Sequence, residues 1–114
     1  MVTHLVLMKP RAGLSSDDRQ AFVAAFERAL RDIATIRNVR IGKRVTFGAG
    51  YESSAADMDY VALIDFDDLD GLQTYLRHPA HADVGARFGQ SLSGALVYDF
   101  EVGGIERLQA DEFI

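Results

Sequence analysis

The sequence predicts an α+β domain with the element order β-α-β-β-α-β, and three observations support this prediction. Four segments show the apolar alternation of strands, and two regions show apolar residues at the three- and four-residue spacing of helices. The chain has 114 residues, which is enough for one domain with a single core. This order is the split βαβ pattern of the ferredoxin-like fold, in which helices cover one face of an antiparallel sheet.

Composition and charge exclude several classes of protein. The chain has no cysteine, which excludes disulfide bonds, thiolate metal sites and a cysteine nucleophile. Its net charge is −5 and its basic residues are scattered, which argues against binding to nucleic acid. No apolar run approaches the roughly 20 residues that span a bilayer, and the first residues lack the basic stretch of a secretion signal. We therefore expect a cytoplasmic protein without a membrane span.

The first strand is predicted over residues 2–9 (VTHLVLMK). Its side chains alternate between two faces, and both faces are largely apolar. One face carries Val2, His4, Val6 and Met8, and the other carries Leu5 and Leu7.

A helix is predicted after the turn that follows this strand. Ser15 is a candidate N-cap with Asp18 three residues on, an arrangement that satisfies free amide donors and complements the helix dipole. Apolar residues then recur every three or four positions to about Thr35, so the helix places one stripe on the sheet. The stripe consists of Phe22, Ala25, Phe26, Ala29, Leu30 and Ile33.

The middle of the chain is predicted to hold two strands joined by a loop. Residues 39–47 (VRIGKRVTF) form the second strand, in which Gly42 marks a bulge or a close approach between strands. Residues 48–57 are polar and form the loop, and residues 60–66 (YVALIDF) alternate as the third strand. One face of the third strand carries Tyr60, Ala62, Ile64 and Phe66, and the other carries Val61 and Leu63.

The last part of the chain is predicted to contain two short helices and a fourth strand. The Pro79 ring suits the first turn of a helix, so the boundary between the helices falls at His78 and the second runs to about Phe88. Residues 95–102 (ALVYDFEV) form the fourth strand and complete a domain of residues 1–102, with a C-terminal tail over 103–114. The apolar stripe of the first short helix consists of Leu69, Leu72 and Leu76.

The second face of the sheet needs a cover. Helices of this topology cover only one face, yet strands one, three and four carry Val, Leu and Tyr on both. A second copy of the chain is the simplest cover, because two-fold pairing is the commonest symmetry of homo-oligomers. The other interpretation is that these strands are hydrophobic and partly exposed.

Two histidines and a tyrosine form a candidate acid–base set. His81 shares a helix face with Val84 and should point toward the sheet, whereas His78 sits at the helix cap in a structural role. His4 lies on the face of the first strand that carries Val6 and Met8, and Tyr75 lies one turn before the proline. A histidine takes a proton near neutral pH and a tyrosine hydroxyl polarises a carbonyl oxygen. A core role, with each polar group satisfied by hydrogen bonds, is the alternative.

The chain resembles the stress-responsive A/B barrel (Dabb) domain family, within the dimeric α/β barrel superfamily. The resemblance runs from His4 to about Phe100 and is carried by residues 4–9 (HLVLMK), by 41–46 (IGKRVT) and above all by 75–81 (YLRHPAH). It implies a homodimer whose sheets form a barrel. Against the family pattern, the loop after the second strand is expanded and the chain continues past the barrel.

The resemblance also implies a candidate chemistry. A plant polyketide cyclase of the family closes a linear thioester by aldol condensation, and its strand-one histidine, helix tyrosine and second motif histidine match His4, Tyr75 and His81. The corresponding hypothesis is that His81 removes a proton next to a carbonyl, Tyr75 hydrogen-bonds the enolate and His4 orients or shares the proton. The residues expected to line the pocket, which is apolar, are Phe26, Tyr60, Ile64, Val84 and Phe88.

Two other functions stay open. In one, the chain is a non-catalytic dimeric binding or stress-response module that holds a small apolar or polyketide-like ligand. In the other, it carries out haem-linked oxygenation, as other members of the superfamily do.

Neither a metal nor a cofactor is predicted. His78 and His81 are three residues apart, but Pro79 lies between them and no carboxylate pair is near. Asp67, Asp68 and Asp70 are explained by the dipole of the helix that they open.

Overall fold

The computed structural model of the chain describes residues 1–109. Within this range the strands and helices follow one another in the predicted order, and the second helical region consists of two helices separated just before Pro79. The strands are β1 (Val2–Pro10), β2 (Ile36–Lys43), β3 (Tyr60–Phe66) and β4 (Leu92–Glu101). The helices are α1 (Ser16–Asp32), α2 (Leu69–Arg77) and α3 (Pro79–Ser91), with short 3₁₀ helices η1 (Gly50–Ser54) and η2 (Ile105–Gln109).

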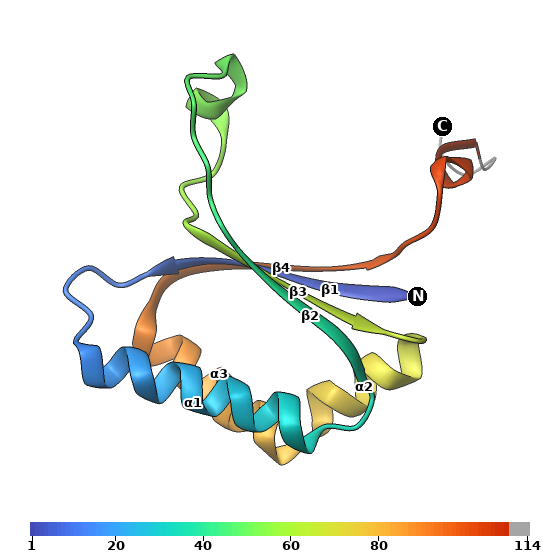
Figure 1. The fold of residues 1–114 in the computed structure, drawn as a ribbon, viewed down its shortest axis with the longest axis horizontal. Coiled ribbons are helices and arrows are strands. Elements are labelled where there is room, and N and C mark those ends of the chain that lie inside the picture. The colour runs from blue at the N-terminus through green and yellow to red at the C-terminus, as the bar shows by residue number, and fades with distance from the viewer. Residues whose placement is uncertain (110–114) are drawn as a thin grey trace.

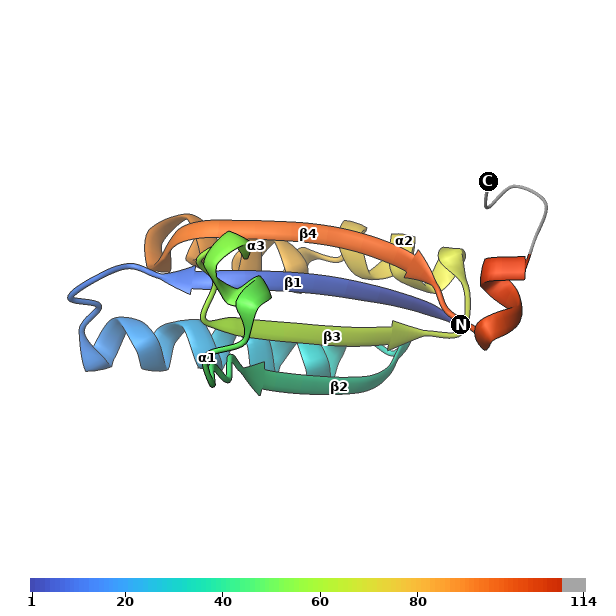
Figure 2. The same cartoon turned by 90° about the horizontal axis from the view of Figure 1, so that it is seen from above.

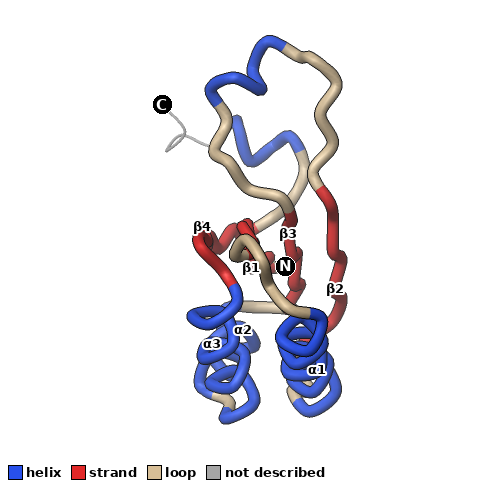
Figure 3. Tube along the Cα trace, turned by 90° about the vertical axis from the view of Figure 1, so that its left-hand side faces the viewer, coloured by secondary structure: helices blue, strands red, loops and turns tan. Residues whose placement is uncertain are grey.

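The strands form one antiparallel sheet in the order β2-β3-β1-β4. The three α-helices lie together on one side of it, as Figure 1 shows in profile, and Figure 2 shows them behind the sheet in a view from above. Figure 3 shows the resulting two layers end-on. The ferredoxin-like α+β prediction is confirmed. No helix among residues 1–109 is long and apolar enough to cross a bilayer.

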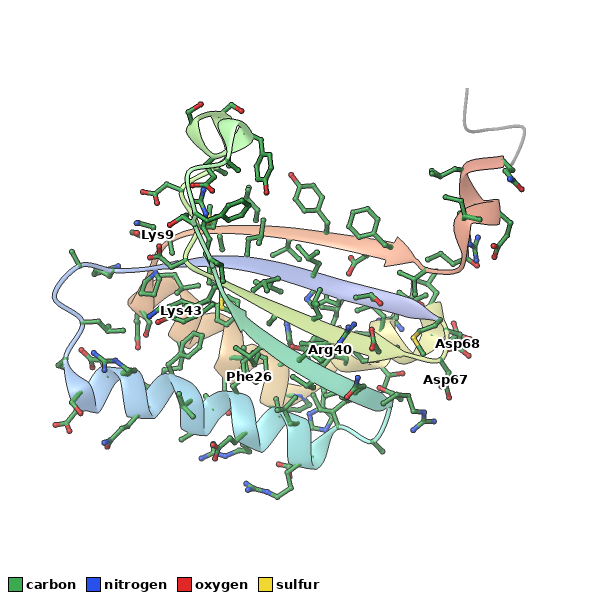
Figure 4. The ribbon with its side chains drawn as sticks, turned by 45° about the horizontal axis from the view of Figure 1, so that its top comes forward. Lys9, Phe26, Arg40, Lys43, Asp67 and Asp68 are labelled. Carbon is green, nitrogen blue, oxygen red and sulfur yellow. The ribbon has the colours of Figure 1, made fainter. Side chains whose placement is uncertain are left out.

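The core fills the space between the sheet and the helices. Alternate residues of β1 and β3 point into it, as the sequence predicted, and Phe26 rises from α1 to meet them (Figure 4). The α2 contribution differs from prediction: Leu72 and Tyr75 are buried, whereas Leu69 and Leu76 are exposed. This helix is only nine residues long and approaches the sheet with the side that carries Tyr75, so the flanking leucines face outward. The buried strand residues are Val6, Met8, Ala62, Ile64 and Phe66.

Helix α1 begins where its capping signal predicts. The Ser15 hydroxyl oxygen accepts a hydrogen bond from the Asp18 amide at 3.0 Å. The helix ends at Asp32, three residues before the predicted end at Thr35, and Ile33 is its C-cap.

The predicted second strand, residues 39–47, is wrong in its boundaries. The observed β2 is Ile36–Lys43, and Val45 and Phe47 lie outside the sheet with exposed side chains. Among residues 1–109, the only neighbour of the edge strand β2 is β3, and β3 begins at Tyr60 opposite Lys43. Beyond that pair the ladder has no partner strand, so the apolar residues that follow leave the sheet.

Gly42 marks a close approach rather than a bulge. It lies in regular register opposite Val61, and a Cβ atom at Gly42 would meet the Val61 Cγ1 atom at 3.0 Å. The irregularity of the β2–β3 pairing lies at the other end of the strand, between Ile36 and Asn38.

The sheet side away from the helices, here called the open face, is largely apolar. The strand registers place successive rows of side chains on it, and its polar end carries Thr3, whose hydroxyl donates to the buried Asp65 carboxylate at 2.6 Å. The Arg40 guanidinium is 3.6 Å from the same carboxylate. The apolar residues of the open face are Leu5, Leu7, Val61, Leu63, Leu96, Tyr98 and Phe100.

The fourth strand and the connections on either side of it also differ in detail from prediction. Strand β4 begins at Leu92 and ends at Glu101, whereas residues 95–102 were predicted. The predicted loop, residues 48–57, contains η1, and the predicted tail, residues 103–114, contains η2. The last part of that tail, residues 110–114, lies outside the described residues.

Candidate functional site

The site begins with a histidine on a central strand. His4 faces the helices from β1 and is almost completely buried. Its register partner on β4 is Asp99, and the His4 Nδ1 atom is 2.5 Å from the Asp99 carboxylate oxygen. An ionised carboxylate only accepts hydrogen bonds, so a neutral His4 ring in this pair carries its proton on Nδ1 and leaves Nε2 as an acceptor.

Tyr75 stands between the two histidines that the sequence singled out. Its ring centroid is 5.7 Å from that of His4 and 4.7 Å from that of His81, with an edge-on arrangement in both cases. On a further side it contacts Phe66 of the core at 5.4 Å. The structure therefore brings His4, Tyr75 and His81 together from β1, α2 and α3.

Burial sets the protonation states of this cluster. Desolvation raises the pKa of Tyr75 to about 12, so the phenol stays protonated and serves as a hydrogen-bond donor. Burial lowers the pKa of His81, nearby His4 lowers it further, and the Leu76 backbone opposes them. Near neutral pH His81 is therefore an uncharged imidazole that can accept a proton.

The polar atoms of the cluster are not sealed in the core. Within residues 1–109, no fully buried side-chain nitrogen or oxygen lacks a hydrogen-bond partner. In that same range the Tyr75 hydroxyl and His4 Nε2 have no hydrogen-bond partner, so both must face space that a water molecule can reach. Two neighbouring rings thus carry one donor and one acceptor that make no hydrogen bond within the described residues.

The third histidine has the structural role that the sequence predicted. His78 ends α2 and caps α3, and its Nδ1 atom accepts a hydrogen bond from the Ala80 amide at 3.0 Å. The Pro79 ring occupies the first turn of α3. His78 therefore lies at the junction of the two helices and serves as a helix cap.

The residues predicted to line a pocket lie in different places. Phe26, Ile64 and Val84 are buried in the core, and Phe88 is half-buried and stacked on Phe22 at 5.2 Å. Of the five, Tyr60 lines a cavity of about 420 Å³ at the end of the sheet. That cavity does not include the three rings. Its lining residues are Pro10, Lys43, Arg44, Thr46, Asp59 and Tyr60.

The acidic cluster at the start of α2 has a structural explanation. The Asp68 carboxylate caps the helix by accepting from the Gly71 amide at 2.9 Å, and Asp67 pairs with Arg37 at 2.8 Å (Figure 4). Among the described residues, no group of three or more His, Cys, Asp or Glu side chains is placed to hold a metal ion.

Asp99 is the member of the site that sequence reasoning missed. The signal was the pairing of the first and last strands: in a ferredoxin-like sheet they are neighbours, so an acid in β4 can lie opposite a histidine in β1. Finding it required the register as well, because a shift of one residue would turn Asp99 to the open face.

Known proteins resemble this chain over most of its length. The stress-responsive A/B barrel domain family model matches residues 2–102. An olivetolic acid cyclase of Cannabis sativa is 21% identical over 99 residues, which cover 87% of this chain and 94% of the cyclase.

Two solved structures resemble the fold. A dimeric ferredoxin-like protein of unknown function from Jannaschia sp. CCS1 is 26% identical and superposes with a TM-score of 0.71 over 89% of this chain and 98% of its own. A hydroxynitrile lyase from Passiflora edulis is 14% identical, with a TM-score of 0.75 over 90% and 93% of the two chains. Because the family model matches residues 2–102, nearly the whole chain, the chain belongs to the stress-responsive A/B barrel domain family.

Proposed function

We propose that this protein is a cofactor-free enzyme that removes a proton from carbon next to a carbonyl group, as in the first step of a polyketide-cyclase-type ring closure. One observation carries the proposal. The Tyr75 ring packs edge-on against both His4 and His81, and the Tyr75 hydroxyl and His4 Nε2 have no hydrogen-bond partner among the described residues.

Each residue has a distinct role in this reaction. The neutral His81 imidazole takes the proton from a carbon between two carbonyls, and the electron pair of the broken C–H bond moves onto the enolate oxygen. The Tyr75 hydroxyl donates a hydrogen bond to that oxygen. The enolate carbon then attacks a second carbonyl of the same substrate, and the resulting alkoxide receives the proton back from His81.

His4 and Asp99 support this proton transfer. Asp99 fixes the Nδ1 proton of His4, so the ring presents the Nε2 lone pair as an acceptor. In this proposal, His4 Nε2 orients groups bound next to Tyr75 and is a second acceptor, beside His81, for the proton taken from the substrate. The uncharged His81 imidazole and the protonated Tyr75 phenol allow the site to bind an uncharged carbonyl group without adding a charge of their own.

The proposed working unit is a homodimer joined through the open face. The half-buried and exposed apolar rows of that face would be covered by a second copy. The Jannaschia relative, described as dimeric, supports this assembly. The similarity to a cyclase supports the reaction class.

The test measures proton abstraction directly, without requiring the natural substrate. A β-diketide thioester is incubated with the protein in D₂O, and loss of the α-proton signal is followed by NMR. The wild type should accelerate the exchange, and His81→Ala should lower the acceleration about 100-fold or more. His78→Ala is the matched control: it removes a histidine three residues away that serves only as a cap, so it should lower stability by about 1 kcal/mol and leave exchange intact.

The opposite pattern would overturn the catalytic proposal. If His81→Ala exchanges the α-proton at the wild-type rate while its melting temperature falls sharply, His81 is a structural residue. If the wild-type protein binds the thioester but does not accelerate its α-proton exchange, the catalytic proposal is wrong. Binding is measured in the same samples from the broadening of the thioester NMR signals.

A non-catalytic binding module is the second candidate function, and one observation favours it. A cavity of about 420 Å³ lies at the other end of the sheet from the three rings, next to Lys43, Arg44 and Tyr60. A protein that only holds a ligand there would bind the thioester, broaden its signals and leave its α-proton exchange at the solvent rate. Tyr60→Ala would then weaken binding, whereas Tyr75→Phe would not.

A further inference from the structure

Residues 44–59, here called the arm, project from the sheet on the side away from the helices. Figures 1 and 3 show the arm rising above the open face, with η1 at its tip. Its base is fixed on that side: the Lys9 ammonium on the open face is 3.0 Å from the Asp57 carboxylate and 3.5 Å from that of Asp59. Met58 lies over Gly94 of β4, within 3.6 Å of where a Cβ atom would be.

The outer part of the arm is held in shape by its own hydrogen bonds. The Glu52 carboxylate accepts from the backbone amides of Phe47 and Ala49 at 2.9 Å and of Gly48 at 3.3 Å. Gly48 has a φ of 85°, a left-handed conformation that glycine adopts without strain. A projection that is ordered before it meets a partner loses little conformational entropy when it binds.

The arm displays large apolar side chains to solvent. Val45, Phe47 and Tyr51 are 78%, 73% and 69% exposed, and the two aromatic rings meet edge-on at 6.4 Å. Further along the open face, Tyr98 and Phe100 are half-exposed and their rings are 6.3 Å apart. Aromatic residues gathered in this way are typical of the centre of protein interfaces.

We propose that the arm is a dimerisation clamp: in the homodimer, Phe47 and Tyr51 of each copy pack against the partner copy. This inference rests on the proposed pairing through the open face. The arm stands on the side of the sheet that this pairing buries, so a second copy seated there must lie against it. Its aromatic residues continue the apolar surface of the open face outward and would enlarge the buried area.

The charge of the arm argues against a membrane as the occupant. It carries Arg44 as its only basic residue against Glu52, Asp57 and Asp59, and the whole chain has a net charge of −5. Anionic lipid surfaces attract basic segments and repel acidic ones. A second copy imposes no such penalty, since Asp57 and Asp59 are already paired with Lys9 of their own chain.

The absence of cysteine in the chain allows a direct test with a single introduced thiol. Tyr51→Cys places a thiol at the tip of the arm, and its reaction with a maleimide is timed in the dimer. The same substitution is timed in a Tyr98→Glu background, where a charge on the open face should keep the protein monomeric. The thiol should react about tenfold or more slowly in the dimer than in the monomer. Ala24→Cys, on the exposed outer side of α1, is the control and should react at one rate in both backgrounds.

Each outcome separates the clamp from the pairing on which it rests. Equal thiol reactivity in the two backgrounds, with the dimer present by sedimentation, overturns the clamp and leaves the pairing in place. A wild type that sediments as a monomer, or a Tyr98→Glu variant that stays dimeric, overturns the pairing and the clamp with it. A second measurement tests the contribution of the arm to dimer affinity. Phe47→Ser combined with Tyr51→Ser should raise the dimer dissociation constant about tenfold or more, and Ser53→Ala should leave it unchanged.

Discussion

His4 and Asp99 lie directly opposite each other in the antiparallel β1–β4 pair, and the His4 Nδ1 atom is 2.5 Å from the Asp99 carboxylate. The two residues are 95 positions apart in the chain, and the pairing of its first and last strands joins them. A neutral histidine paired in this way has one defined tautomer, so a carboxylate on the edge strand determines which nitrogen His4 offers to the site.

This relationship predicts the effect of Asp99→Asn. The amide can donate to His4 Nδ1 and stabilise the opposite tautomer, so α-proton exchange in the thioester assay should fall about 10- to 100-fold. The fold should persist, because the Asp99 side chain is 43% exposed. Asp83→Asn is the control, an exposed acid on α3 whose exchange rate should equal that of the wild type. If Asp99→Asn matches the wild type, the tautomer of His4 does not matter to the reaction.

Tyr75→Phe separates the phenol hydroxyl from the phenol ring. The ring is buried between His4, His81 and Phe66, but the hydroxyl has no hydrogen-bond partner among the described residues, so its removal should leave the melting temperature nearly unchanged. Loss of the donor to the enolate oxygen should slow exchange about 100- to 1,000-fold. Tyr75→Ala, which also removes the ring, should lower stability by about 3–5 kcal/mol. Wild-type exchange by Tyr75→Phe would remove the hydroxyl from the mechanism.

The lowered pKa of His81 predicts a pH dependence of stability. Its pKa in the unfolded chain is about 6.5 and its folded value is lower, so between the two values the unfolded state binds more protons. The contribution of neutral His81 to stability is therefore complete above about pH 6.5 and is lost as the pH falls through the folded pKa. Urea unfolding at pH 7.5 and 5.5 should show a larger loss for the wild type than for His81→Gln. An imidazole titration by NMR with a midpoint above 6.5 would contradict the sign.

Two isoleucines on the same face of the sheet test where the core ends. Ile64 on β3 is fully buried and Ile41 on the edge strand β2 is 60% exposed. Ile64→Ala should lower the free energy of unfolding by about 2–5 kcal/mol, because it leaves a cavity in the core. Ile41→Ala should change it by no more than about 0.5 kcal/mol. Similar losses in the two variants would place Ile41 in an interface that the monomer does not show, and sedimentation of both variants distinguishes that case.

Most of the fold could be predicted because local signals agree with it. Alternation placed the inward faces of β1 and β3, the Ser15 cap began α1 within one residue and Pro79 divided α2 from α3. The boundaries of β2 could not be predicted, because Val45 and Phe47 continue its apolar pattern after its partner strand has ended. Strand propensity is a property of each residue, whereas the hydrogen bonds of a β-sheet require a neighbouring strand.

The candidate site divides in the same way. The spacing of residues 75–81 and the face of β1 were enough to select Tyr75, His81 and His4, and the structure brings all three rings into contact. Asp99 was not selected, because its role depends on the β1–β4 register. Phe26, Ile64 and Val84 were expected to line a pocket but are packed in the core. A sequence pattern shows which face a side chain takes but not how closely the opposite layer approaches.

By itself, the sequence determined the elements, their order, the inward faces of the central strands and the three rings of the site. These follow from interactions within a few residues and from the period of each element. The tertiary structure alone decided that Asp99 orients His4, that β2 ends at Lys43 and that Phe47 and Tyr51 stand on an arm above the open face. Those features depend on register and on the meeting of distant segments, which long-range packing sets and local chemistry does not.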